Sequence, residues 1–167
     1  MKELLKAAID SLEIQDVYVA GFYSWLKEDF DPKYSLEKDD LTVQYKHVVE
    51  KAVIAELRDE DEDNVMRLYK VFITLGARWV HGDLEEDDDS QDPTNPDEKI
   101  KALIEAHYIL EYRMENEVEE GSLDAFALNN ASYHVWPYWR ELLMNHCLRM
   151  NMPKLALPTL QLASNRK

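Results

Sequence analysis

Apolar and polar residues alternate with different periods along the chain, and each change of period marks a new element. Residues 1–12 predict a short amphipathic helix, because their apolar residues recur on one side of a helical turn. From Gln15 the residues become β-branched and aromatic, and the run DVYVAGFYSWL at 16–26 predicts a strand. A polar crossover containing Asp31 and Pro32 follows, with Phe30 immediately before it.

Three apolar segments separated by polar turns come next: Leu41–Leu57, Val65–Val80 and Ile100–Met114. Val65–Val80 is dominated by alternating β-branched and aromatic residues, which predicts a strand and favours an antiparallel meander. The other two segments can also be written with a helical period, so the pattern alone leaves strand and helix open. The acidic run RDEDEDN at 58–64 is most simply a hairpin turn.

The segment Asp83–Glu98 combines like charges with two prolines and almost no apolar residue, which predicts a solvated, flexible loop. A calcium site is the alternative, but the run DLEEDDDSQDPT lacks the glycine and the terminal glutamate of an EF-hand loop. We therefore favour the loop.

The C-terminal part predicts helix after Gly121 and contains a proline in an unusual place. Pro137 lies within the amphipathic run Ser132–Pro158, although a proline inside a helix costs about 3 kcal/mol. It therefore indicates a helix start or a functional kink. Four aromatic residues flank it: Tyr133, Trp136, Tyr138 and Trp139. The run breaks at Met152-Pro153 into a short apolar tail.

Length and composition predict one domain spanning 1–167, with a hydrophobic fraction of 46% that is ordinary for a globular protein. No apolar run approaches the roughly 18–20 residues that span a bilayer. The first residues interleave acids with apolar side chains, unlike a signal peptide. A cytoplasmic soluble protein is the simplest interpretation.

The net charge of −15 is the strongest bulk property. With 19 basic against 34 acidic residues, the chain has no electrostatic footprint for nucleic acid, and an anionic membrane would repel it. The charge keeps an exposed apolar surface soluble and suits basic or unfolded partners. The charge alone is explained more simply if the chain is an acidic soluble protein and the charge has no role in binding a partner.

Catalytic and metal-binding patterns are scarce. The five histidines show no HExxH spacing, and four glycines provide no phosphate-binding loop. Cys147 lies among leucines and methionines, so a core position is simpler than a nucleophile paired with His134. We therefore expect no enzyme activity, no metal and no cofactor.

Apolar and aromatic residues exceed what a small core requires. On the predicted strand Phe22 and Tyr23 point to opposite faces, and Trp25 shares the side of Tyr23. Either a helix and a subunit partner cover the two faces, or one face is an exposed groove for apolar segments of another chain. The predicted long C-terminal helix also carries more aromatic, leucine and methionine residues than one face of a sheet can cover. This predicts a subunit interface at Tyr138, Trp139, Leu142, Leu143 and Met150.

From Ala102 to Leu160 the chain resembles the SecB family of protein-export chaperones. The resemblance is carried by Gly121, by Phe126, Asn130 and Ala131, by HVWPYWRE at 134–141, by Arg149-Met150 and Met152-Pro153, and by LALPTL at 155–160. Upstream, IQDVY at 14–18 is similar to the family's first strand and DFDP at 29–32 to its crossover loop.

The resemblance implies an α+β fold, with a four-stranded antiparallel sheet and the long C-terminal helix packed on one face. The short N-terminal helix and the acidic loop look like additions. It also implies a homotetramer built as a dimer of dimers, and apolar grooves that hold unfolded polypeptides without nucleotide. Phe30 matches a groove-lining aromatic residue of the family and is the first candidate for client contact. Phe22 and Trp25 are further candidates by position alone.

The chain departs from the family at the positions that bind the SecA motor. Export members of the family bind SecA through acidic residues on two strands. The matching positions here are Gly21, Trp25 and Ala106, none of them acidic, with only the apolar Ile104 retained. This argues against SecA docking. The sequence therefore predicts an ATP-independent holdase that binds non-native polypeptides, including preproteins, and keeps them competent for transport. The alternative is an adaptor dedicated to one partner, such as an antitoxin in a toxin-antitoxin-chaperone system.

Overall fold

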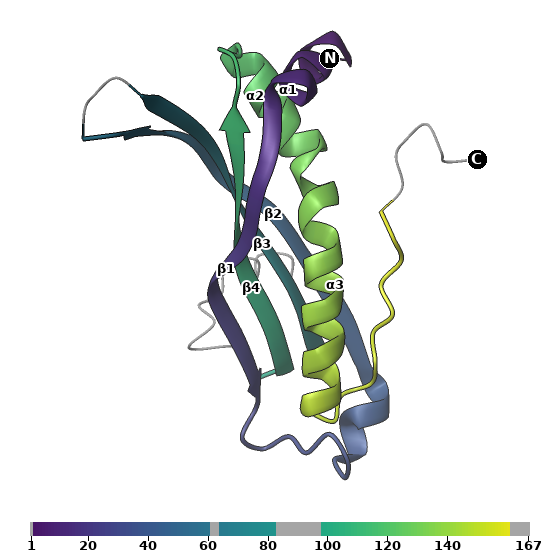
Figure 1. The fold of residues 1–167 in the computed structure, drawn as a ribbon. Coiled ribbons are helices and arrows are strands. Elements are labelled where there is room, and N and C mark those ends of the chain that lie inside the picture. The colour runs from purple at the N-terminus through teal and green to yellow at the C-terminus, as the bar shows by residue number, and fades with distance from the viewer. Residues whose placement is uncertain (1, 61–63, 83–97, 161–167) are drawn as a thin grey trace.

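The computed structural model describes residues 2–60, 64–82 and 98–160. Its helices and strands follow in the order α1 (Lys2–Ser11), β1 (Leu12–Leu26), the 3-10 helix η1 (Leu36–Asp40), β2 (Leu41–Arg58), β3 (Val65–His81), β4 (Ile100–Met114), α2 (Glu120–Asn129) and α3 (Ala131–Arg149) (Figure 1). The predicted acidic loop at 83–98 lies outside the described residues, except for Glu98.

The four strands form one antiparallel sheet in the order β1-β4-β3-β2. β2, β3 and β4 follow one another as a meander, and β1 pairs with the free side of β4, so β1 and β2 are the edges. Arg58 pairs with Val65 across the predicted hairpin turn at 58–64, of which residues 61–63 are not described. Both segments that the pattern left open are strands.

β4 is a strand in spite of its helix-forming residues, because it lies between two partners. Every second residue from Ala102 to Tyr112 is buried on the face that α3 covers, opposite the equivalent alternation from Tyr69 to Trp79 on β3. Burial against two neighbouring strands and a helix therefore outweighs the local propensity.

α3 packs along one face of the sheet, as predicted (Figure 1). Residues spaced by four along α3 form a buried stripe on that face: Ala131, Val135, Trp139, Leu143 and Cys147. Pro137 lies well inside α3 and points away from the sheet, so it does not mark the start of the helix.

The N-terminal helix α1 packs on α2 at one end of the sheet (Figure 1). Ala8 is the buried contact residue of α1. Among the described residues, no helix combines the length and the apolar character needed to cross a bilayer.

Candidate functional site

α3 runs between the two edge strands and leaves one flank on either side of itself. On the side of β1, the Phe22 ring lies 4.4 Å from the His146 ring, and the Ser24 hydroxyl lies 3.0 Å from the Met150 sulfur. Tyr138 and Leu142 lie two turns and one turn before His146 on the same stripe of the helix. We call this surface the β1 flank: Ile14, Val19, Phe22, Tyr138 and Leu142. All but the half-buried Leu142 are exposed.

The opposite side of α3, next to β2, is covered by the tail, residues 152–160. There the His47 ring of β2 lies 2.8 Å from the Ser132 hydroxyl and 6.3 Å, centroid to centroid, from the Trp136 ring. Trp136 Nε1 donates to the Pro158 carbonyl at 2.7 Å, and Arg140 Nε donates to the Leu157 carbonyl at 2.9 Å. We call this surface, formed by His47, Trp136 and Arg140, the β2 flank.

The end of α3 determines the direction of the tail. Asn151 has a φ of 53°, the left-handed conformation that ends many helices and that asparagine tolerates better than most residues. The Met152 N–H donates to the Cys147 carbonyl at 2.9 Å, which closes the last turn. Pro153 then prevents the helix from continuing. The chain therefore reverses and runs back alongside α3 (Figure 1).

The start of the tail also closes a pocket at the crossover end of the sheet. This pocket has a volume of about 270 Å³. It is lined by Phe30, Pro32, Lys38, Asp39, Leu41, Asn151, Met152 and Pro153. Phe30 is only 5% exposed there and belongs to the hydrophobic core. The pocket thus joins the crossover after β1 to the end of α3.

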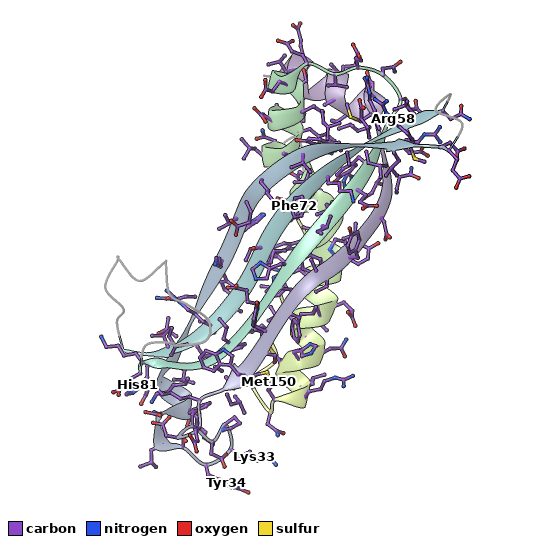
Figure 2. All side chains as sticks on the ribbon, turned by 90° about the vertical axis from the view of Figure 1, so that its left-hand side faces the viewer. Lys33, Tyr34, Arg58, Phe72, His81 and Met150 are labelled. Carbon is purple, nitrogen blue, oxygen red and sulfur yellow. The ribbon has the colours of Figure 1, made fainter. Side chains whose placement is uncertain are left out.

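The face of the sheet opposite α3, which faces the viewer in Figure 2 and carries Phe72, is held by polar contacts between strands. The buried carboxylate of Glu105 lies 3.5 Å from Lys46 Nζ and 3.4 Å from His107 Nε2. The Thr74 hydroxyl lies 2.7 Å from His107 Nδ1. Further along, Lys70 pairs with Glu111 at 2.7 Å and lowers the pKa of that carboxyl. These contacts span the three strands β2, β3 and β4.

The three residues predicted for client contact do not share one surface. Phe30, expected on an open groove, is buried, because the crossover turns inward at Lys27, whose carbonyl accepts a hydrogen bond from the Phe30 N–H. Phe22 is exposed on the β1 flank. Trp25 lies on the opposite face of the sheet and is half-buried, as the strand alternation predicted.

The predicted interface residues of α3 divide into two groups. Trp139 and Leu143, 1% and 0% exposed, face the sheet of their own subunit, so their assignment to a surface between subunits is wrong. The physical reason is the four-residue spacing that places them in the buried stripe. Tyr138 is 51% exposed, while Leu142 and Met150 are half-buried on the side of β1.

The four positions matched to SecA docking do not share one surface. Ile104 and Ala106 are fully buried under α3, whereas Gly21 and Trp25 lie on the other face of the sheet. The two β4 positions are therefore not accessible to a partner in this structure.

Trp136, Arg140 and His47, which form the β2 flank, were missed by sequence reasoning. The block containing Trp136 and Arg140 suggested fold and assembly, but nothing in it indicated hydrogen bonds to the tail. Their four-residue spacing was the available signal, since it places both on one side of α3.

Four antiparallel strands with a long helix on one face, and a short helix before them, define an α+β fold of the SecB-like class. The SecB-like chaperone Rv1957 of Mycobacterium tuberculosis, solved in complex with a ChAD peptide from the Rv1956 HigA1 antitoxin, has a similar structure. It aligns with a TM-score of 0.59 and 15% identity, covering 95% of this chain and 97% of that chain. At this identity, the likeness shows the fold.

A protein of unknown function from Streptococcus agalactiae aligns with a TM-score of 0.36 and 9% identity, covering 89% of this chain and 98% of that chain. No protein-family model matches the sequence, and no curated protein is significantly similar to it.

Proposed function

We propose that this protein is an ATP-independent molecular chaperone, a holdase that binds unfolded or non-native polypeptides in the cytoplasm. Its clients would include preproteins, which it would keep unaggregated and competent for transport. The proposal rests on the SecB-like fold and on one further observation, the apolar side chains that remain exposed along both edges of the sheet.

The exposed side chains that carry the proposal are those on the face that carries α3. On β2, Tyr45 and Ile54 are 56% and 50% exposed and form the strip that we assign to clients, and the β1 flank is a second apolar strip at the other edge, which we assign to subunit contacts below. A monomeric soluble protein rarely leaves such strips without a partner. The net charge of −15 supports the same function, since it opposes self-association while apolar surface is exposed.

The β1 flank is the surface that we assign to subunit contacts within a dimer of dimers. From Val17 to Leu26 the strand β1 carries no charged residue, whereas β2 carries Lys46, Glu50 and Lys51 in its middle. Charges on an edge strand oppose pairing with another chain. β1 is therefore the edge suited to pair with a second copy, next to the exposed Tyr138.

The alternative function is that of an adaptor dedicated to one partner. One observation favours it, namely that the structurally similar mycobacterial chaperone was solved with a peptide from an antitoxin. We do not extend the proposal to the SecA motor, because neither Gly21 nor Trp25 is acidic and the matched β4 positions are buried.

The test is suppression of aggregation, followed by light scattering as several unrelated unfolded proteins are diluted from denaturant without nucleotide. We expect suppression of all of them by the parent protein and a marked loss in the double variant Tyr45→Asp, Ile54→Asp. Leu36→Asp is the matched control, because Leu36 is 97% exposed on η1, away from the strips. Suppression of one protein only would favour the adaptor, and suppression of none would refute the holdase.

A further inference from the structure

The tail lies on the β2 flank in the manner of a bound extended peptide. Among the described residues, no backbone–backbone hydrogen bond joins 153–160 to the rest of the protein. The contacts come instead from side chains of α3 that reach the tail's backbone carbonyls. Trp136 and Arg140 each donate one hydrogen bond, to Pro158 and Leu157 respectively.

The side chains of the tail alternate as those of an extended chain do. Leu155 is half-buried and Leu157 is buried, whereas Ala156 between them is exposed. Leu155 packs against the hydrophobic core to which Cys147 of the buried stripe of α3 belongs. The tail thus packs two apolar side chains, two residues apart, against the core, while the β2 flank binds the carbonyls of Leu157 and Pro158 that follow.

The hydrogen bonds to the tail's carbonyls and the packing of its leucines require an apolar segment, but they do not require the tail's particular sequence. Carbonyl groups are present in every polypeptide, so donors that bind them tolerate many sequences. We propose that the β2 flank is a binding site for an extended apolar segment of another polypeptide, and that the tail occupies this site in the free protein. The inference rests on the proposed function, for which it names the site and its regulation.

Two features make the tail displaceable. It lacks the ladder of backbone hydrogen bonds that fixes a strand, so it belongs to the part of a protein that opens most readily. An incoming segment can also replace each contact it breaks, since it brings its own carbonyls and apolar side chains. Displacement of residues 153–160 would also move Pro153, which lines the pocket together with Phe30.

The first experiment measures binding of a fluorescent peptide with the sequence of residues 152–160, MPKLALPTL, to full-length chains. In Leu157→Asp the tail loses its buried anchor, so the site is free and the peptide should bind about tenfold or more tighter than to the parent. Ala156→Asp is the matched control, because it adds the same charge at an exposed position and should bind like the parent. Leu157→Ala replaces Leu157→Asp if the latter does not show cooperative unfolding.

A further variant identifies the site. Adding Trp136→Phe to Leu157→Asp removes the indole donor while keeping an aromatic ring, so peptide affinity should fall several-fold. Equal affinity of the parent and Leu157→Asp, or no effect of Trp136→Phe, would overturn the inference.

The single cysteine of the chain provides the second experiment. Cys147 is fully buried, and its backbone carbonyl accepts a hydrogen bond from the N–H of Met152 at the start of the tail, so its alkylation by a maleimide should be slow in the parent and faster in Leu157→Asp. An unfolded polypeptide that displaces the tail should accelerate alkylation of the parent, while one that binds elsewhere should not. Suppression of aggregation without any change at Cys147 would refute the inference and leave the holdase function standing. If aggregation is not suppressed, the peptide experiment still decides whether the tail occupies a binding site.

Discussion

Replacement of Phe30 by alanine tests whether this residue belongs to the core or to an open client surface. Removing a buried phenylalanine side chain costs about 3–5 kcal/mol of unfolding free energy. Phe30 is 5% exposed and borders a pocket of about 270 Å³, so its surroundings are less closely packed than those of a fully enclosed core residue. We therefore expect the lower end, about 3 kcal/mol. At about 2–4 °C per kcal/mol for a chain of this size, Tm should fall by roughly 6–12 °C.

The assay is urea and thermal unfolding, followed by circular dichroism at one fixed protein concentration because association also contributes to stability. Tyr34→Ala is the matched control, since Tyr34 is an aromatic residue of the same crossover and 81% exposed (Figure 2). It should change Tm by no more than 1 or 2 °C, corresponding to about 0.5 kcal/mol for an exposed site. Phe30→Leu, which keeps most of the apolar volume, should lose less than about 1.5 kcal/mol. If Phe30→Ala is no more destabilising than Tyr34→Ala, the burial argument is wrong and Phe30 returns to the client surface.

Three further predictions concern α3 and the core beneath it. Tyr138→Ala should weaken association in sedimentation velocity while changing stability by less than about 1 kcal/mol, whereas Trp139→Ala should cost about 3–5 kcal/mol in urea unfolding. Burial lowers the pKa of both His47 and His134 below the ordinary 6.5, so the unfolded chain binds more protons than the folded one near and below that pH. The contribution of both histidines to stability should therefore be complete well above pH 6.5 and decrease as the pH falls from about 7 to about 5, with a smaller decrease in His134→Gln, as measured by urea unfolding. Burial also raises the pKa of Tyr69 to about 12, so its phenol should stay protonated past pH 10 in an ultraviolet titration and ionise early in a denatured sample.

Patterns in the sequence predicted the strands at 16–26 and 65–80 and the helical C-terminal part, because each has a clear period. The two ambiguous segments were decided by the resemblance, and the structure explains why the pattern could not decide them. Ile104 and Ala106 suit a helix or a strand equally, and only the strands on both sides of β4 select the strand. The boundary between α2 and α3 at Asn130 carried no recognisable signal, since its side chain caps neither helix.

The functional surface was harder to predict, because exposure depends on contacts between distant parts of the chain. Phe22, Trp25 and Phe30 look alike in the sequence, yet they lie on a flank, on the opposite face and in the core. The case of Phe30 goes further, since Met152 and Pro153 line the same pocket and their position depends on the reversal of the chain at Asn151. If the tail leaves the β2 flank, that pocket loses one of its walls. Whether Phe30 is a core residue or a contact residue would then be a property of the tail's position, and the two readings of Phe30 would describe two states of one protein.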